Sequence, residues 1–139
     1  MLRAATLSVT ITLLMLFPIY SAYASDGPVG RVTPPKLLDT QGNEVSSASA
    51  GQLVFISTQF ATDDRTPYVL FIEARDETGI TVFSEFAIGQ IEPLGQTTIG
   101  LSWSPDEPGE YILRSFALAT LNNVAPLTAI SERAVTVSS

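Results

Sequence analysis

The chain has 139 residues with no histidine, no cysteine and a net charge of −7, because 14 acidic residues outnumber 7 basic ones. Without cysteine it has neither disulfides nor thiolate ligands for soft metals, and without histidine it lacks the commonest general base. An acidic surface repels phosphate backbones, so we expect no nucleic-acid partner.

The N-terminal segment, residues 1–24, has the pattern of a signal peptide. An uncharged, mostly apolar stretch covers residues 4–24, and Pro18 interrupts it near its end. Ala22-Tyr23-Ala24 places small residues at the two positions that signal peptidase recognises, which predicts cleavage before Ser25. We therefore expect a hydrophobic signal helix and a secreted protein that acts outside the cell, in the medium or at the cell surface.

The same stretch leaves open a retained membrane anchor. If residues 4–24 were helical throughout, they would span roughly 30 Å, which matches the hydrocarbon core of a bilayer. No second apolar run of that length follows in the sequence. A membrane is therefore an expected partner only if this segment is kept.

Residues 25–50 are predicted to form an extended leader and a first edge strand. Pro34 and Pro35 suit only an edge strand or a linker, because proline donates no backbone hydrogen bond. Residues 36–38 form the candidate strand. Residues 39–43 have the composition of a turn, and residues 46–50 that of a polar connection.

From Gly51 onward, apolar and polar residues alternate in several segments, which is the pattern of strands with one buried face. Turn sequences such as Asp76-Glu77-Thr78-Gly79 separate these segments. With residues 36–38, about seven strands without helical periodicity predict an all-β fold, an antiparallel β-sandwich over residues 51–139. The further strands are expected at residues 52–60, 68–75, 80–88, 96–103, 110–120 and 129–137.

Two segments, Gly51-Gln52-Leu53-Val54-Phe55-Ile56 and the stretch from Trp103 to Tyr111, resemble an immunoglobulin-like module. The chain is most similar to cell-adhesion-related domains of prokaryotic surface proteins, including secreted archaeal ones, over roughly residues 51–137. It departs from that family near the end of the second strand, where Ala61-Thr62 replace a frequent asparagine. The resemblance implies an immunoglobulin-like β-sandwich and a location at the cell surface, and no reaction. It assigns structural positions to Gly51, Gln52, Trp103, Pro105, Gly109 and Tyr111.

One sheet is predicted to expose apolar side chains on its outer face. If Leu70 and Leu113 face the core, strict alternation turns their neighbours outward. A contiguous apolar strip of this kind usually marks a partner surface, unless a bulge flips part of a strand or the leader covers it. The predicted partner-binding residues are Phe71, Phe116, Leu118 and, depending on the register, Phe83.

The two acidic turns, Asp76-Glu77 and Asp106-Glu107, are expected at one end of the sandwich, with Asp39 and Glu44 within reach. Calcium binds several oxygen ligands at once, which leaves calcium open as a cofactor, but the spacing matches no calcium-binding motif. Acidic loop tips are ordinarily solvated. The prediction is therefore no metal site and no cofactor.

Trp103 and Tyr111 allow two interpretations. They could stack against a sugar ring, or Tyr111 could bind backbone at the corner between the sheets while Trp103 packs inward. The second interpretation is the one we predict, because both residues flank a proline-rich turn that needs support.

No catalytic residue is predicted. Paired carboxylates can hydrolyse glycosides without histidine, but the chain has no phosphate-binding loop and no nucleophile elbow, and short loops offer little cleft. The expected function is a non-enzymatic binding or adhesion module with a protein or other cell-surface partner. The alternative is a structural subunit of a surface filament or layer, in which residues 25–38 add a strand to a neighbouring copy.

Overall fold

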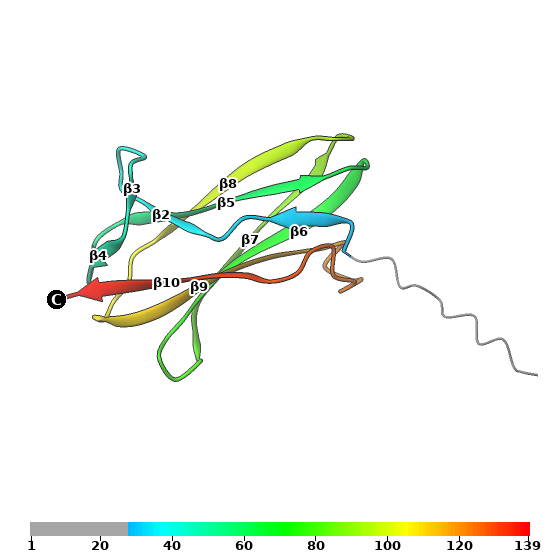
Figure 1. Cartoon of the computed structure of the whole chain (residues 1–139). Coiled ribbons are helices and arrows are strands. Elements are labelled where there is room, and N and C mark those ends of the chain that lie inside the picture. The colour runs from blue at the N-terminus through cyan, green and yellow to red at the C-terminus, as the bar shows by residue number, and fades with distance from the viewer. Residues whose placement is uncertain (1–27) are drawn as a thin grey trace, which may run out of the picture.

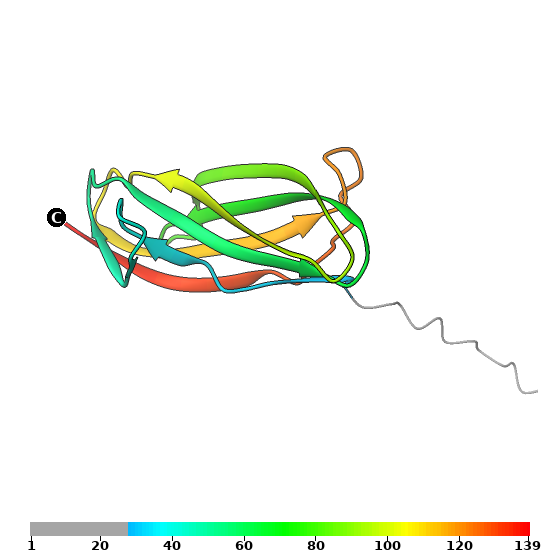
Figure 2. The ribbon, with the colours of Figure 1, turned by 90° about the horizontal axis from the view of Figure 1, so that it is seen from above.

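The structure, a computed structural model, describes residues 28–139, so the expected signal helix and cleavage position lie outside the described residues. Over this range the chain is all-β, with two sheets packed against each other (Figures 1 and 2). Within residues 28–139, no helix has the length and hydrophobicity that a membrane crossing requires. The strands are β1 (Gly30–Val32), β2 (Lys36–Leu38), β3 (Glu44–Val45), β4 (Ser47–Ser49), β5 (Val54–Thr62), β6 (Thr66–Arg75), β7 (Thr81–Ile91), β8 (Gln96–Trp103), β9 (Gly109–Leu118) and β10 (Ser131–Ser138).

The first sheet is organised around β5. Strand β8 pairs with one edge of β5, while the short strands β1 and β2 pair one after the other along the opposite edge. Strand β3 extends this sheet by pairing with β2. Pro34 and Pro35 lie between β1 and β2, where the absence of proline amide hydrogens breaks no ladder.

The second sheet has the strand order β4-β10-β9-β6-β7. One of its pairs differs from the expected antiparallel pattern, because β4 runs parallel to β10. Residues 46–50, predicted as a polar connection, therefore contain a strand. Similarly, most of the predicted leader belongs to the sandwich, since β1 and β2 lie in the first sheet. Strands of three residues are too short to show alternation, so the sequence pattern could not identify β1 or β4.

The core lies between the two sheets and is built mostly from their central strands. Burying one valine, leucine, isoleucine or phenylalanine side chain stabilises the fold by about 1.5–3 kcal/mol relative to leaving it exposed. Leu37 is fully buried, so β2 is an integral part of the core. The largest apolar side chains with no exposed surface are Leu37, Val54, Ile56 and Phe60 from the first sheet and Leu70, Ile72 and Leu113 from the second.

A buried hydroxyl network ties the connector between β1 and β2 to both sheets. The Thr58 hydroxyl in β5 donates to the Thr33 carbonyl oxygen at 2.7 Å, and the Ser115 hydroxyl in β9 donates to the same oxygen at 3.2 Å. The Thr58 and Ser115 oxygens lie 3.2 Å apart, and both residues are buried. The ladder with β5 is interrupted between β1 and β2, and there the two hydroxyls satisfy the buried Thr33 carbonyl oxygen in place of a backbone amide.

Thr58→Val should destabilise the fold by about 1–3 kcal/mol, because it removes one of the two hydroxyl donors to a buried carbonyl at nearly constant volume. Urea unfolding followed by the fluorescence of Trp103 would measure the change in the free energy of unfolding. The matched control is Thr98→Val on the exposed side of β8, which should change stability by no more than about 0.5 kcal/mol. Equal stability of the two variants would contradict a structural role of the network.

Candidate functional site

A row of three aromatic side chains crosses the outer face of the second sheet. Phe86 in β7, Phe71 in β6 and Phe116 in β9 occupy directly paired positions. The rings of Phe71 and Phe116 are stacked at 5.3 Å with an interplanar angle of 9°, and Phe86 lies 5.6 Å from Phe71. Because paired residues of adjacent strands point to the same side, the rings form one continuous surface, and Phe86 is 45% exposed.

Aliphatic side chains continue this surface two residues further along each strand. Ile88 pairs with Val69, and Val69 pairs with Leu118. Val69 is buried between its neighbours, Leu118 is half-buried and Ile88 is exposed. The outer apolar strip is the set Phe71, Phe86, Phe116, Val69, Ile88 and Leu118.

A row of charges borders the strip on its other side. The Arg114 guanidinium lies 3.2 Å from the Glu73 carboxylate and 2.9 Å from the Glu132 carboxylate, and Arg75 lies 3.7 Å from Glu73. Because Arg114 and Glu73 are largely buried, the pairing compensates the loss of their hydration. The strip therefore has an edge of charges held in fixed positions.

The outer face of the first sheet differs sharply from this arrangement. Its outward positions on β8 alternate with core positions and carry small or polar residues, among them Thr98 and Ser102. Gln59 on β5, paired with Thr98, is also exposed. That is the ordinary pattern of an antiparallel sheet with one solvated face. Only the second sheet presents aromatic residues in a row on its outer side.

The structure places Phe71, Phe116 and Leu118 together on the outer face, where the alternation predicted them. Phe83 lies on the opposite face, because it pairs with Ala74 and its ring packs 6.3 Å from Trp103 in the core. The strip contains Phe86 in its place.

The geometry of the β6–β7 hairpin explains this difference. Hydrogen bonds between Asp76 and Ile80 close a three-residue loop in which Gly79 has a φ of 84°. A bulge then shifts the register between Ala74 and Arg75. Each one-residue shift of the register moves a side chain to the other face of the sheet. The loop length and the bulge together therefore decide whether Phe83 or Phe86 faces outward. The turn sequence alone did not distinguish these loop lengths.

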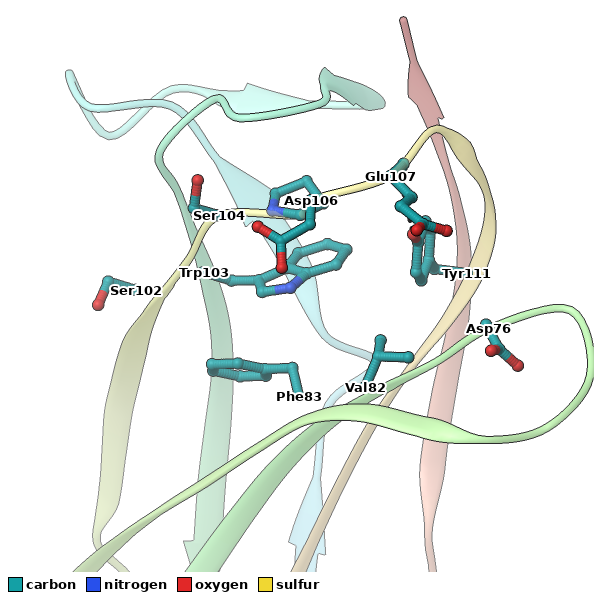
Figure 3. A pocket seen from close by; sticks show the side chains of 10 residues that line it. Asp76, Val82, Phe83, Ser102, Trp103, Ser104, Asp106, Glu107 and Tyr111 are labelled. Carbon is teal, nitrogen blue, oxygen red and sulfur yellow. Dashed lines mark hydrogen bonds between the residues drawn. The ribbon is translucent and has the colours of Figure 1, made fainter.

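A pocket of about 420 Å³ lies at the end of the sandwich between the β6–β7 turn and the β8–β9 loop (Figure 3). Trp103 and Tyr111 meet edge to face at 5.3 Å in its wall. The Tyr111 hydroxyl donates a hydrogen bond to the Glu107 backbone carbonyl at 2.7 Å, and both aromatic residues are buried. The predicted structural role of this pair at the corner is therefore confirmed.

Negative charge surrounds the pocket. The pKa of Tyr111 is raised, first because its hydroxyl is desolvated and then because the carboxylates of Glu107, Asp76 and Asp106 repel a phenolate. Asp76 has a lowered pKa, mainly because the Thr78 hydroxyl and the Ile80 amide donate hydrogen bonds to it. A carboxyl with a lowered pKa is poorly suited to act as a general acid near neutral pH.

The two other acidic residues considered for this end are engaged elsewhere. The carboxylate of Glu44 binds Lys36 at 3.0 Å and Arg133 at 2.9 Å, and these partners lower its pKa. Asp39 accepts hydrogen bonds from Asn43 and Gln41 within its own turn, which lowers its pKa. Within residues 28–139, no group of three or more acidic side chains has a geometry that could hold a metal ion.

No family model matches the chain, and no curated protein matches it. Among solved structures, the C-terminal domain of Wzt aligns with a TM-score of 0.71 and 12% identity, over 81% of this chain and 75% of that domain. The CARDB domain of a Pyrococcus furiosus protein, solved with di-metal ions, aligns with a TM-score of 0.55 and 12% identity, over 80% of this chain and 90% of that one.

A third similar structure is the Pseudomonas fluorescens alkylpurine DNA glycosylase AlkC bound to DNA, with a TM-score of 0.56 and 9% identity. The alignment covers 81% of this chain and only 31% of the glycosylase. At such identities the likenesses show the fold alone. Together with the sheet topology, they define the chain as an all-β immunoglobulin-like module, as the sequence resemblance predicted.

The lowered pKa of Asp76 predicts that the β6–β7 turn weakens in acid. A carboxyl of this kind stabilises the fold above its unfolded pKa of 3.8, and the contribution is lost as the pH falls through the lower folded pKa. Asp76→Asn keeps an acceptor oxygen but cannot titrate. Its stability should therefore fall less steeply than that of the parent between about pH 5 and pH 2, as measured by urea unfolding at each pH.

Asp64→Asn is the control, since the Asp64 carboxylate accepts no hydrogen bond from any residue that the structure describes. It also removes one acidic group, so it corrects for the change in net charge. Identical pH profiles for Asp76→Asn and the parent would show that the turn hydrogen bonds do not favour the ionised carboxyl.

Proposed function

We propose that the protein is a non-catalytic immunoglobulin-like binding module of adhesion type that acts outside the cell, and that the outer apolar strip is its partner-binding surface. The observation that carries this proposal is the stacked row of Phe86, Phe71 and Phe116 on one outer face, opposite a polar face on the other sheet. Contiguous exposed apolar surface of this kind marks interaction sites in soluble domains.

The chemistry of the strip favours a protein as its partner. Aromatic residues occupy its centre, and the Glu73, Arg114 and Glu132 charges form its border. Protein interfaces commonly combine an aromatic centre with a polar rim, and Phe and Arg are enriched in them. The strip extends across three strands of a sheet, which suits a broad interface better than a small molecule.

The pocket beside Trp103 supports a non-catalytic role. The Tyr111 hydroxyl is committed to the Glu107 carbonyl, and Asp76 is committed to its own turn. These two groups hold the corner of the sandwich together, so the Tyr111 hydroxyl and the Asp76 carboxylate are not free to act on a substrate.

Phe86→Asp and Phe116→Asp should each abolish most partner binding, because they place a charge in the centre of the apolar interface. For a residue of this kind we expect a loss of about 2 kcal/mol or more, which is roughly a 30-fold rise in Kd. The measurement is capture of surface proteins from the cells of origin by the immobilised full chain, followed by titration of the captured partner.

Thr98→Asp on the outer face of the first sheet is the matched control, because it adds the same charge at an exposed position. It should bind as the parent does. Phe86 is more exposed than Phe116, so Phe86→Asp remains informative if Phe116→Asp fails to fold. Undiminished capture by Phe86→Asp would contradict the proposed surface.

A second candidate function, a subunit of a surface filament or layer, is favoured by one feature. Strand β7 has 11 residues and ends its sheet, so its outer edge has no strand partner among residues 28–139. Long free edges invite strand addition. The donor first considered for this function, residues 25–38, includes β1 and β2, which already pair with β5 and would have to leave it.

Under this second candidate, the full chain should self-associate, and Gln90→Lys, at an exposed position of β7 outside the outer apolar strip, should reduce the association because a lysine on an edge strand opposes pairing. Light scattering over a range of protein concentrations measures the mass directly. A mass that stays monomeric at every concentration would rule this candidate out.

A further inference from the structure

One end of the sandwich exposes large apolar side chains on three separate loop segments. Val29 precedes β1, Leu94 lies in the β7–β8 turn, and Leu121 and Val124 lie in the β9–β10 loop. Leu94 is 83% exposed and Val124 is 70% exposed. These four residues are termed the apolar loop tips. Loop tips normally carry polar residues, so four apolar side chains at one end call for an explanation.

Hydrogen bonds hold the three segments at the same end, on the right in Figure 1. The Thr62 hydroxyl donates to the Val29 carbonyl at 3.2 Å, and the Thr62 amide donates to the Gly95 carbonyl at 3.3 Å. Gly30 pairs with Thr62, and its amide donates to the Leu127 carbonyl at 2.9 Å. The start of β1 therefore joins both the β7–β8 turn and the β9–β10 loop.

The backbone at Leu94 is unusual. Its φ of 56° lies in the left-handed region, which disfavours residues with a side chain, and glycine or asparagine would fit there at less cost. Hydrogen bonds from Leu94 to Asp63 and from Gly95 to Glu92 fix the turn. The turn thus holds the Leu94 side chain in solvent, where no packing contact offsets the cost of its left-handed backbone.

The chain enters the sandwich at this same end. Pro28 directly precedes Val29, and residues 4–24 are uncharged and long enough, if helical, to span roughly 30 Å of bilayer. Residues 25–27 can reach no more than about 11 Å even when fully extended. If residues 4–24 lie in a bilayer, the loop end of the sandwich must therefore lie at its surface.

The charge distribution fits the same orientation. The acidic turns that contain Asp76 and Asp106 lie at the opposite end of the sandwich. At the loop end, Arg65 pairs with Glu92 at 2.7 Å and Arg31 lies 3.8 Å from Asp63, so most charges there are neutralised. An end with paired charges approaches a negatively charged lipid surface more easily than an acidic one.

We propose that the loop end of the sandwich docks on a lipid bilayer, with the apolar loop tips Val29, Leu94, Leu121 and Val124 inserted at the interface. Apolar side chains inserted at this depth gain binding energy in proportion to the area they bury. Docking orients the domain, with its acidic end pointing away from the membrane. This inference goes beyond the partner-binding role of the outer apolar strip and does not depend on it. It applies to the chain that keeps residues 4–24 as a membrane anchor, the alternative to cleavage before Ser25.

The absence of native cysteine allows a direct test with single-cysteine variants. Leu94→Cys and Val124→Cys are labelled with an environment-sensitive fluorophore, and the full chain is reconstituted in phosphatidylcholine vesicles. Emission at both positions should shift to the blue and should be quenched by lipids that carry a nitroxide on the headgroup. Ile80→Cys is the matched control, an exposed apolar position beside the β6–β7 turn at the far end, where neither effect is expected.

Equal signals at all three positions overturn the proposal, whether the labels are quenched everywhere or nowhere. A response at positions 94 and 124 that appears only at high protein-to-lipid ratios assigns this end to contacts between copies and also overturns it. Thermal unfolding of each labelled variant confirms that it is folded, and Val29→Cys replaces any loop variant that is not. Because Phe86→Asp leaves the loop tips intact, it should dock as the parent does, which separates this test from that of partner binding.

Discussion

Apolar contact between the inner faces of the two sheets, joined by the hydroxyl network at Thr33, holds a chain that has no cysteine for disulfides. The central strands β5, β6 and β9 supply most of this contact. Side chains alternate along each of them, so every residue that packs inward turns its neighbours outward. The core therefore also decides which residues reach the two outer faces.

Because side chains alternate along the core strands, the two sheets expose different kinds of residue on their outer faces. On β5 and β8, the neighbours of core residues are mostly polar or small, and the first sheet has an ordinary solvated face. On β6 and β9, the neighbours of Leu70 and Ser115 include Phe71 and Phe116, whose rings stack on each other. The same alternation thus gives a polar outer face on the first sheet and an apolar one on the second. The difference lies only in which residues occupy the outward positions.

The two ends of the sandwich differ as well. At one end, the Trp103 and Tyr111 rings close the core beneath acidic turns, and the hydrogen bond from Tyr111 to Glu107 holds the β8–β9 loop. At the other end, Thr62 and Gly30 join the loops that carry the apolar tips. The Gly30 backbone packs closely on Phe60, since a Cβ there would come within 2.6 Å of the ring. The close contact of Gly30 with the buried Phe60 ring therefore fixes the position at which the chain enters the domain.

The sequence predicted the long strands well and the outer apolar strip only in part. The pattern over residues 96–103 predicted β8 with its bounds, and the corner role of Tyr111 followed from its place after a proline-rich turn. Phe71 and Phe116 were found because no bulge interrupts the pairing of β6 with β9. Phe83 was assigned conditionally, because the register of β7 depends on a bulge that leaves no mark in the alternation.

By itself, the amino-acid sequence determined the all-β class, the positions of the long strands and the turns between them. These follow from the spacing of apolar residues and from glycine and proline, which are properties of near neighbours in the chain. Only the tertiary structure decided that β1 and β4 are strands, that β4 runs parallel to β10, and that Phe86 rather than Phe83 faces outward. Those features depend on hydrogen-bond partners far apart in the sequence, and the partners meet only when the two sheets have packed.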